Sequence, residues 1–343
     1  MNNFSEYEKM PKNFNKLGQD IKVFNELNKL KWVVTEKVHG ANFSFVYEGK
    51  KLAYAKRKEY LAWGDDFFGF QEVAYRLEDK ILALFEQLAQ EKAGDKYMLY
   101  GELFGGSYPH PYVAARPNVQ AIQTGVYYAP QIDFCAFDIA IEKDGVKAYI
   151  DYEDAIAYLE KYGIFHARIL FTGGLNEALN FNTRIDSLVP GQLGLPALES
   201  NLIEGVVIKP LRHAGLIEAD ERPVVKLKNR EFDEEKKFHE AEKWSYIPSI
   251  TTNTEELGFV LEGMRGYITD NRLNSVISKT GSIDFGNPAR MAAISAEYLR
   301  DVLEDFNIDN NGILDEVTAV QKDWLTERLK AEILEAVLLR RLV

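Results

Sequence analysis

The lysine at position 37 has the sequence context of a possible nucleophile. It lies in the stretch Thr35–Asn42, directly after a strand expected at residues 31–34 and shortly before Gly40, where the chain can turn tightly. A lysine attacks an electrophile only as the uncharged amine, a form that burial or neighbouring cations favour. Taken alone, the stretch fits a surface lysine in a β-hairpin better than a catalytic one, so its meaning depends on residues elsewhere in the chain.

Carboxylates and further lysines occur in other short apolar stretches. Glu102 stands in the apolar strand expected around residues 97–104, and Glu204 is the second residue of the strand expected at residues 203–210. Lys226 and Lys228 are two residues apart, so they project from the same face of a strand and repel unless an anion lies between them. Carboxylates that hold Mg²⁺, together with cations that offset phosphate charge, are the groups that phosphoryl or nucleotidyl transfer uses.

Other chemistries lack their characteristic patterns in this sequence. There is no His/Cys cluster typical of zinc, no phosphate-binding glycine loop of the Walker or dinucleotide type, no kinase loop and no Gly-x-Ser-x-Gly elbow. Residues 307–318 imitate a calcium-binding loop, but Asn307 replaces the expected Asp at the first position and Thr318 replaces the expected Glu at the twelfth. This segment is better interpreted as a helix-capping turn.

Hydrophobic spacing predicts two domains. Residues 1–243 combine short strands with helices at 71–92 and 153–162. Residues 172–200 are expected to form an excursion that lies outside the core. A charged helix is expected up to residue 243. Residues 244–343 show helical spacing at 289–306 and at 313–342, which predicts a small all-α domain. The fold class is therefore α+β followed by an all-α domain.

Composition restricts the class of protein further. With 343 residues, 46% of them hydrophobic, and no apolar run of membrane-spanning length, the chain is expected to be water-soluble, and its N-terminal residues do not resemble a secretory signal. Cys135 is the only cysteine, which excludes an internal disulfide and fits a reducing cytoplasm. The net charge of −12 argues against a protein that simply coats phosphates, although a local basic groove is compatible with it.

Five short motifs in a fixed order resemble those of the covalent nucleotidyltransferases, the superfamily of DNA ligases, RNA ligases and capping enzymes. The first motif has His39 where that superfamily usually has Asp, and Lys-x-His-Gly-x-Asn-Phe is similar to the second RNA ligase family, typified by a phage T4 enzyme and trypanosome RNA-editing ligases. The five stretches are Lys37–Phe43, Tyr100–Glu102, Phe137–Ile139, Glu204–Lys209 and Lys226–Lys228. The resemblance spans residues 30–235 and implies mainly antiparallel sheets flanked by helices, while the helical C-terminal domain resembles that family's in length and class.

The resemblance implies a role for each of the reactive residues. Lys37 would attack the α-phosphate of ATP, expel pyrophosphate and hold AMP as a phosphoramide. Lys226 and Lys228 would meet the α-phosphate, and one of them near Lys37 would favour its uncharged form by repulsion. Glu204 would bind Mg²⁺ or Mn²⁺. His39 would serve the departure of pyrophosphate.

The remaining motif residues would bind the nucleotide and the RNA. Glu36 and Phe137 would bound the adenine, with the ring of Phe137 stacked on its face. Arg57 and Glu102 would hold the ribose, and the guanidinium of Arg57 also suits phosphate. Asn42 would contact the RNA phosphate. Each residue alone fits a structural role, and only the order of all five motifs favours a site.

The resulting expectation is an ATP-dependent RNA ligase that joins 3′-hydroxyl and 5′-phosphate ends of RNA, in a duplex or a bridged nick. A monomer without membrane contact is expected, located in the cytoplasm and encoded by a phage or virus. A capping guanylyltransferase or a DNA ligase of the same superfamily is the first alternative, although an OB-type barrel would normally follow the fifth motif and here the sequence turns helical. A non-catalytic RNA-binding protein on a ligase scaffold is the second alternative, against which Lys37, Glu204 and both lysines of the fifth motif argue.

Overall fold

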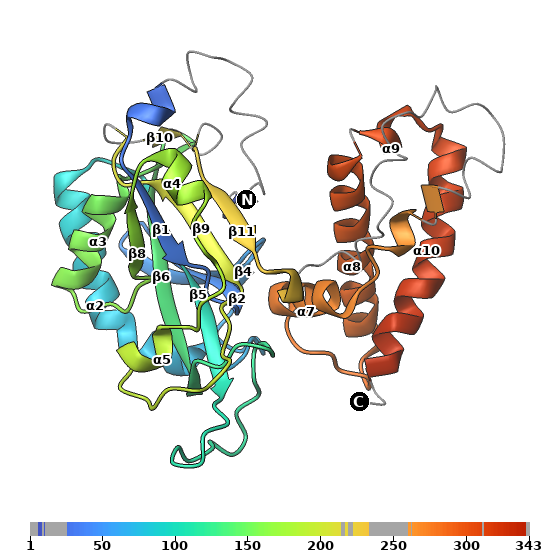
Figure 1. The fold of residues 1–343 in the computed structure, drawn as a ribbon, viewed down its shortest axis with the longest axis horizontal. Coiled ribbons are helices and arrows are strands. Elements are labelled where there is room, and N and C mark those ends of the chain that lie inside the picture. The colour runs from blue at the N-terminus through green and yellow to red at the C-terminus, as the bar shows by residue number, and fades with distance from the viewer. Residues whose placement is uncertain are drawn as a thin grey trace. The chain divides into compact units, whose positions relative to one another are not determined.

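The computed structural model describes residues 6–8, 10, 26–213, 217–218, 222–232, 260–261, 263–310 and 312–340. Contacts divide the chain into two compact units, residues 1–231 and residues 232–343 (Figure 1). The predicted domain boundary between residues 243 and 244, and the charged helix predicted before it, lie outside the described residues.

The first unit contains two antiparallel sheets, which confirms the predicted α+β class. One sheet has the strand order β11-β9-β1-β8, and the other has the order β10-β7-β6-β5-β2-β3-β4. The strands are β1 (Trp32–Glu36), β2 (Ala41–Glu48), β3 (Lys51–Lys56), β4 (Tyr60–Leu61), β5 (Lys96–Ser107), β6 (Ala129–Lys143), β7 (Val146–Tyr149), β8 (Ile169–Gly173), β9 (Gly205–Pro210), β10 (Ile217–Glu218) and β11 (Val225–Lys228). The helices are α2 (Phe70–Glu91), α3 (Tyr152–Lys161), α4 (Leu175–Leu179) and α5 (Val189–Gln192).

The main core lies between the seven-stranded sheet and the two longer helices. Helix α2 buries an apolar stripe at helical spacing, including Val73, Leu77, Ile81 and Leu84, against β2, β5 and β6. Helix α3 contributes to the same core. Both helices agree with the predictions from the sequence, and they leave the opposite face of this sheet for other contacts.

The two strands on either side of Lys37 do not form a hairpin. Strand β1 pairs with β8 and β9 in the four-stranded sheet, whereas β2 pairs with β3 and β5 in the seven-stranded sheet. Residues 37–40 therefore form the crossover from one sheet to the other. Gly40 is required there because a Cβ atom at this position would lie 1.9 Å from the carbonyl oxygen of Leu103.

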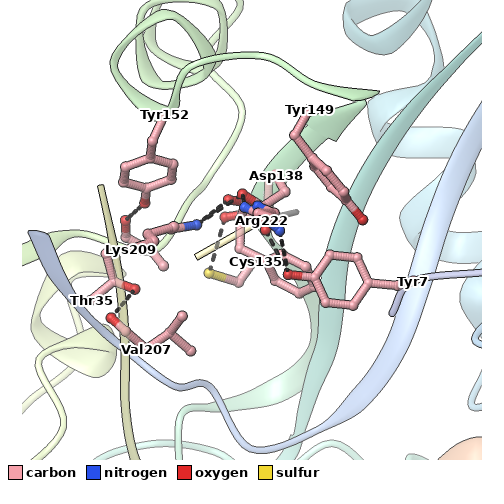
Figure 2. Close-up of polar contacts among 12 residues, drawn as sticks. Tyr7, Thr35, Cys135, Asp138, Tyr149, Tyr152, Val207, Lys209 and Arg222 are labelled. Atoms are coloured by element: carbon pink, nitrogen blue, oxygen red, sulfur yellow. Dashed lines mark hydrogen bonds and ion pairs between the residues drawn. The ribbon is translucent and has the colours of Figure 1, made fainter. Parts of the chain in front are cut away.

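A buried ion cluster joins the two sheets (Figure 2). Lys209 on β9 donates to Asp138 on β6 at 2.9 Å, and Arg222 pairs with the same carboxylate. The hydroxyl of Tyr7 donates to the other oxygen of Asp138 at 2.7 Å. Burial opposes ionisation of Asp138, but Arg222 and Lys209 outweigh it and hold the pKa of this carboxyl below its ordinary value. The cluster thus supplies a charge-paired link between β6 and β9.

Replacing Asp138 by alanine is expected to destabilise the first unit by about 3–5 kcal/mol, because two buried cations would lose their counter-charge. Urea unfolding followed by fluorescence measures this loss. The matched control is Glu59→Ala, which removes an exposed carboxylate paired with Lys56 at 2.7 Å and is expected to cost less than about 1 kcal/mol. A loss for Asp138→Ala as small as that of the control would contradict a linking role.

The second unit is helical where it is described. Its helices α7 (Asp270–Thr280), α8 (Pro288–Asp309), α9 (Ile313–Glu316) and α10 (Ala319–Leu339) share one apolar core. The single helix predicted over residues 313–342 is wrong, because Val317 is extended and Thr318 starts a new helix through a capping box with Gln321.

The segment that imitates a calcium loop is built as a helix-capping turn. The side-chain oxygen of Asn307 accepts from the backbone N–H of Leu314 at 2.7 Å, and its amide donates to Asp315 at 3.0 Å. Across the described residues, no group of three or more His, Cys, Asp or Glu side chains is arranged to hold a metal ion. No helix among them is long and apolar enough to cross a membrane.

Candidate active site

Two lysine ammonium groups and one imidazole converge on a buried carboxylate, that of Glu204. The ammonium of Lys37 lies 2.5 Å from Oε2, and the ammonium of Lys228 lies 3.0 Å from Oε1. Nδ1 of His39 lies 3.3 Å from Oε2. The side chain of Glu204 is 1% exposed, whereas those of Lys37, His39 and Lys228 keep 18%, 15% and 11% of their surface. The structure therefore brings residues of the first, fourth and fifth motifs into direct contact.

The strand order explains this convergence. Strand β9 lies between β1 and β11, so the ends of both neighbours flank Gly205. The N–H of Lys37 donates to the carbonyl of Gly205 at 2.9 Å, and Lys228 is the register partner of Gly205 on the other side. A Cβ atom at Gly205 would lie 2.0 Å from the carbonyl oxygen of Leu227, so only glycine allows this approach. The N–H of Asn229 donates to the carbonyl of Glu204 at 2.8 Å and fixes its backbone.

The charge of Glu204 is set by its neighbours. Burial alone would raise the pKa of this carboxyl, but Lys37, Lys228 and His39 outweigh burial and hold the pKa well below its usual range. Glu204 is therefore an ionised oxygen donor. One carboxylate suits Mg²⁺ only when substrate phosphates and waters complete the shell, which is the way Mg²⁺ usually binds beside nucleotides.

A second carboxyl, that of Glu102, lies in the same electrostatic neighbourhood. Burial, followed by the nearby charge of Glu204, raises its pKa to about 7, while Lys37 and Arg57 act in the opposite direction. Asn42 on β2 is the register partner of Glu102 on β5. Glu102 on β5 of the seven-stranded sheet and Glu204, directly before β9 of the four-stranded sheet, therefore both interact with the charge of Lys37.

The carboxyl of Glu36 is held by the segment between α4 and β9. The hydroxyl of Ser187 donates to Glu36 at 2.6 Å, and the N–H of Leu188 donates at 3.2 Å. Burial raises the pKa of Glu36 to about 7 despite these two hydrogen bonds. The interpretation of residues 172–200 as an excursion outside the core is wrong, because this segment also buries Leu175 and Val189.

The two raised carboxyl pKa values give the fold a defined pH dependence. Between about pH 4.5 and pH 7 the folded protein retains protons on Glu36 and Glu102 that the unfolded chain has released, so stability falls as the pH rises through this window. The variant Glu36→Gln is expected to make this decline shallower by up to about 3 kcal/mol between pH 5 and pH 8. Urea unfolding at a series of pH values measures the slope, with Glu59→Gln as the exposed control. An unchanged slope would show that Glu36 titrates normally.

Two further predicted site residues, Phe137 and Lys226, lie on β6 and β11. Phe137 packs edge-on against Tyr7 with ring centroids 5.1 Å apart, and its carbonyl accepts from Lys209 at 2.8 Å. It lies at a register shift between β5 and β6. Lys226 lies two residues before Lys228 on β11, opposite Val207. Their predicted contacts with adenine and with the α-phosphate stay predictions.

The structure adds residues that the sequence did not single out. The hydroxyl of Tyr128 accepts from the N–H of His39 at 2.8 Å, and the amide of Gln123 donates to the carbonyl of Gly40 at 3.4 Å. Both hold the crossover that carries Lys37. No sequence signal marked Tyr128 or Gln123. The position of Asn229, directly after Lys228 of the fifth motif, could have suggested that Asn229 lies near the site.

Comparisons with known proteins find matches among RNA ligases. Residues 30–228 match the family model described as RNA ligase, and residues 251–335 match the model described as T4 RNA ligase 2 C-terminal. The mitochondrial RNA-editing ligase 2 of Trypanosoma brucei brucei is 29% identical over 85% of this chain and 80% of its own length. The mitochondrial RNA-editing ligase 1 of the same organism is 32% identical over 53% of this chain, which spans 45% of that relative. A solved RNA ligase from Naegleria gruberi has a TM-score of 0.43 and 17% identity, over 68% of this chain and 58% of its own.

Proposed function

The chain belongs to the RNA ligase family, and on this premise we propose that it uses ATP to seal RNA ends carrying a 3′-hydroxyl and a 5′-phosphate. The observation that carries the proposal is the convergence of Lys37, His39 and Lys228 on the buried carboxylate of Glu204. A nucleophile, cations for phosphate and an ionised oxygen donor are the groups that nucleotidyl transfer needs at one point.

In the first step, the amine of Lys37 attacks the α-phosphorus of ATP. A nitrogen–phosphorus bond forms, the bond to pyrophosphate breaks, and the lysine proton leaves. The ion pair between Lys37 and Glu204 must open for this attack. Because Lys228 contacts the same carboxylate, Glu204 keeps a counter-charge when Lys37 turns to the substrate, which avoids a buried unpaired charge.

In the second step, the adenylyl group passes from Lys37 to the 5′-phosphate of the RNA. In the third step, the 3′-hydroxyl attacks that phosphate, the strand is joined and AMP leaves. The ammonium groups of Lys226 and Lys228 offset the charge on the α-phosphate. Glu204 would hold Mg²⁺ or Mn²⁺, which when bound supplies further charge neutralisation at the phosphates.

The other predicted residues bind and orient the reactants. Glu36 and Phe137 bound the adenine, and Arg57 and Glu102 hold the ribose. The raised pKa of Glu102 suits this role, because a protonated carboxyl can donate as well as accept a hydrogen bond to a ribose hydroxyl.

Two residues of the first motif complete the proposal, His39 at the departing pyrophosphate and Asn42 at the RNA phosphate. A duplex or bridged nick as the substrate, a monomeric state, a cytoplasmic location and a phage or viral origin stay predictions from the sequence.

A nick-sealing assay with the full chain tests the proposal. The substrates are two nicked duplexes that differ only in the strand with the 3′-hydroxyl, which ends in ribonucleotides in one and is all DNA in the other. We expect sealing with ATP and Mg²⁺ and a clear preference for the ribonucleotide end. Labelling of the protein by GTP instead of ATP would favour a capping enzyme, and equal sealing of both duplexes would favour a DNA ligase. RNA binding without any protein–AMP adduct would favour a non-catalytic protein.

A further inference from the structure

The segment between β5 and β6, residues 108–128, is a long loop without helix or strand, and it projects beyond the ends of these strands (Figure 1). Loops of this length inside a compact domain are uncommon and usually functional. Near its C-terminal end, the loop contacts the crossover at residues 37–40. Tyr128 accepts a hydrogen bond from the N–H of His39, and Gln123 donates one to the carbonyl of Gly40. At its other end, the hydroxyl of the buried Tyr108 donates to the carbonyl of Pro196.

Three aromatic rings follow one another at alternate positions of this loop. Tyr108 stacks on His110 with centroids 6.4 Å apart and an interplanar angle of 29°, and His110 lies 5.5 Å from Tyr112. The rings run from buried Tyr108, 4% exposed, to Tyr112, 90% exposed. We call Tyr108, His110 and Tyr112 the ring ladder.

Two prolines restrict the backbone of the ring ladder. Prolines 109 and 111 separate the rings, and each fixes its own φ angle and restricts the residue before it. The N–H of Tyr112 donates to Nδ1 of His110 at 3.2 Å, so the neutral imidazole carries its proton on Nε2. The backbone that presents the exposed ring of Tyr112 is therefore already restricted, which lowers the entropy lost when this segment is ordered by binding.

The charge of this region also departs from the rest of the chain. The sequence has 53 acidic residues among 343, yet none lies between positions 103 and 132. Arg116 is exposed in the same loop. In a protein of net charge −12, this loop can approach a polyanion without carboxylate repulsion.

We propose that the ring ladder is a stacking platform for an unpaired base of the RNA substrate, close to the ends that are joined. This inference rests on the proposed function, since it takes RNA as the substrate. Unpaired bases expose a π-face that aromatic side chains bind, whereas bases inside an A-form helix are covered by their neighbours. Tyr112 offers the outer ring, His110 supports it, and Arg116 faces the phosphates.

The test compares binding of two nicked RNA duplexes by fluorescence anisotropy. One duplex is fully paired, and the other carries a short single-stranded extension beside the nick. For Tyr112→Ala in the full chain we expect affinity for the second RNA to fall about tenfold while affinity for the paired RNA stays within about twofold. Tyr112→Trp should restore binding. The matched control is Tyr75→Ala, which removes another exposed tyrosine, 83% exposed on α2, and should change neither affinity.

Equal affinity of Tyr112→Ala and wild type for the extended RNA would overturn the proposal, and so would an equal loss on both RNAs. Formation of the protein–AMP adduct, followed by intact mass, should be unchanged in every variant. A wild-type protein that forms no adduct would contradict the proposed function, whereas a normal adduct with unchanged binding by Tyr112→Ala would contradict only the stacking platform.

Discussion

The variant Lys37→Arg is expected to form no protein–AMP adduct and to seal RNA more than about 10³-fold more slowly than wild type. Arginine keeps a cation against Glu204, so the fold and the buried charge are preserved, but its guanidinium stays protonated and cannot attack phosphorus. Labelling with α-labelled ATP measures the adduct directly. The control is Lys31→Arg, a change at an exposed lysine just before β1, which should be labelled like wild type.

A supplementary substrate separates loss of the nucleophile from general damage. Lys37→Arg should still join RNA that already carries AMP on its 5′-phosphate, because in the proposed mechanism only the first two steps use the lysine amine. Residual labelling of Lys37→Arg at a wild-type rate would show that another residue carries the adenylyl group.

The variant Glu204→Gln is expected to slow adduct formation about 10²- to 10³-fold. Glutamine keeps the shape of the side chain but removes the negative charge that Lys37, His39 and Lys228 share, so the three groups lose their common partner. It also removes the ionised oxygen that suits Mg²⁺. Adduct formation measured over a range of Mg²⁺ concentrations tests both losses.

Two comparisons make the result for Glu204→Gln interpretable. Thermal unfolding of the variant detects any loss of fold, and Glu59→Gln, a neutralised surface carboxylate, should behave like wild type in both measurements. If a folded Glu204→Gln protein forms the adduct at the wild-type rate, Glu204 has no role in adduct formation.

The structure brings together three side chains from separate motifs. Lys37, Glu204 and Lys228 are far apart in sequence but meet because β9 lies between β1 and β11. The alternation of Lys226 and Lys228 also predicted their common strand face, yet their position relative to Glu204 depends on register. Register is set by pairing between distant strands, which local patterns do not reveal.

Other features of the site depend on contacts that no local pattern encodes. The crossover at residues 37–40 looked like a hairpin because the sequence cannot show that β1 and β2 pair with other strands. Glu36 and Ser187 are 151 positions apart. A lone charge in an apolar strand, such as Asp138, indicates that a partner exists but does not identify Lys209 or Arg222.

The break between α9 and α10 was predictable in principle. Thr318 and Gln321 have the spacing of a capping box, a signal for the start of a helix. Hydrophobic spacing continued across this point and favoured one long helix instead. Here a capping signal of four residues outweighed the periodicity, because Val317 takes an extended conformation that ends α9.

The intact mass of the full-length protein, recorded before and after incubation with ATP and Mg²⁺, tests the adenylylation of Lys37 most directly. We predict a gain equal to one adenylyl group, with the modified peptide containing Lys37, and no gain with GTP. An unchanged mass, or an adenylyl group on any other residue, would contradict the role of Lys37 as the nucleophile.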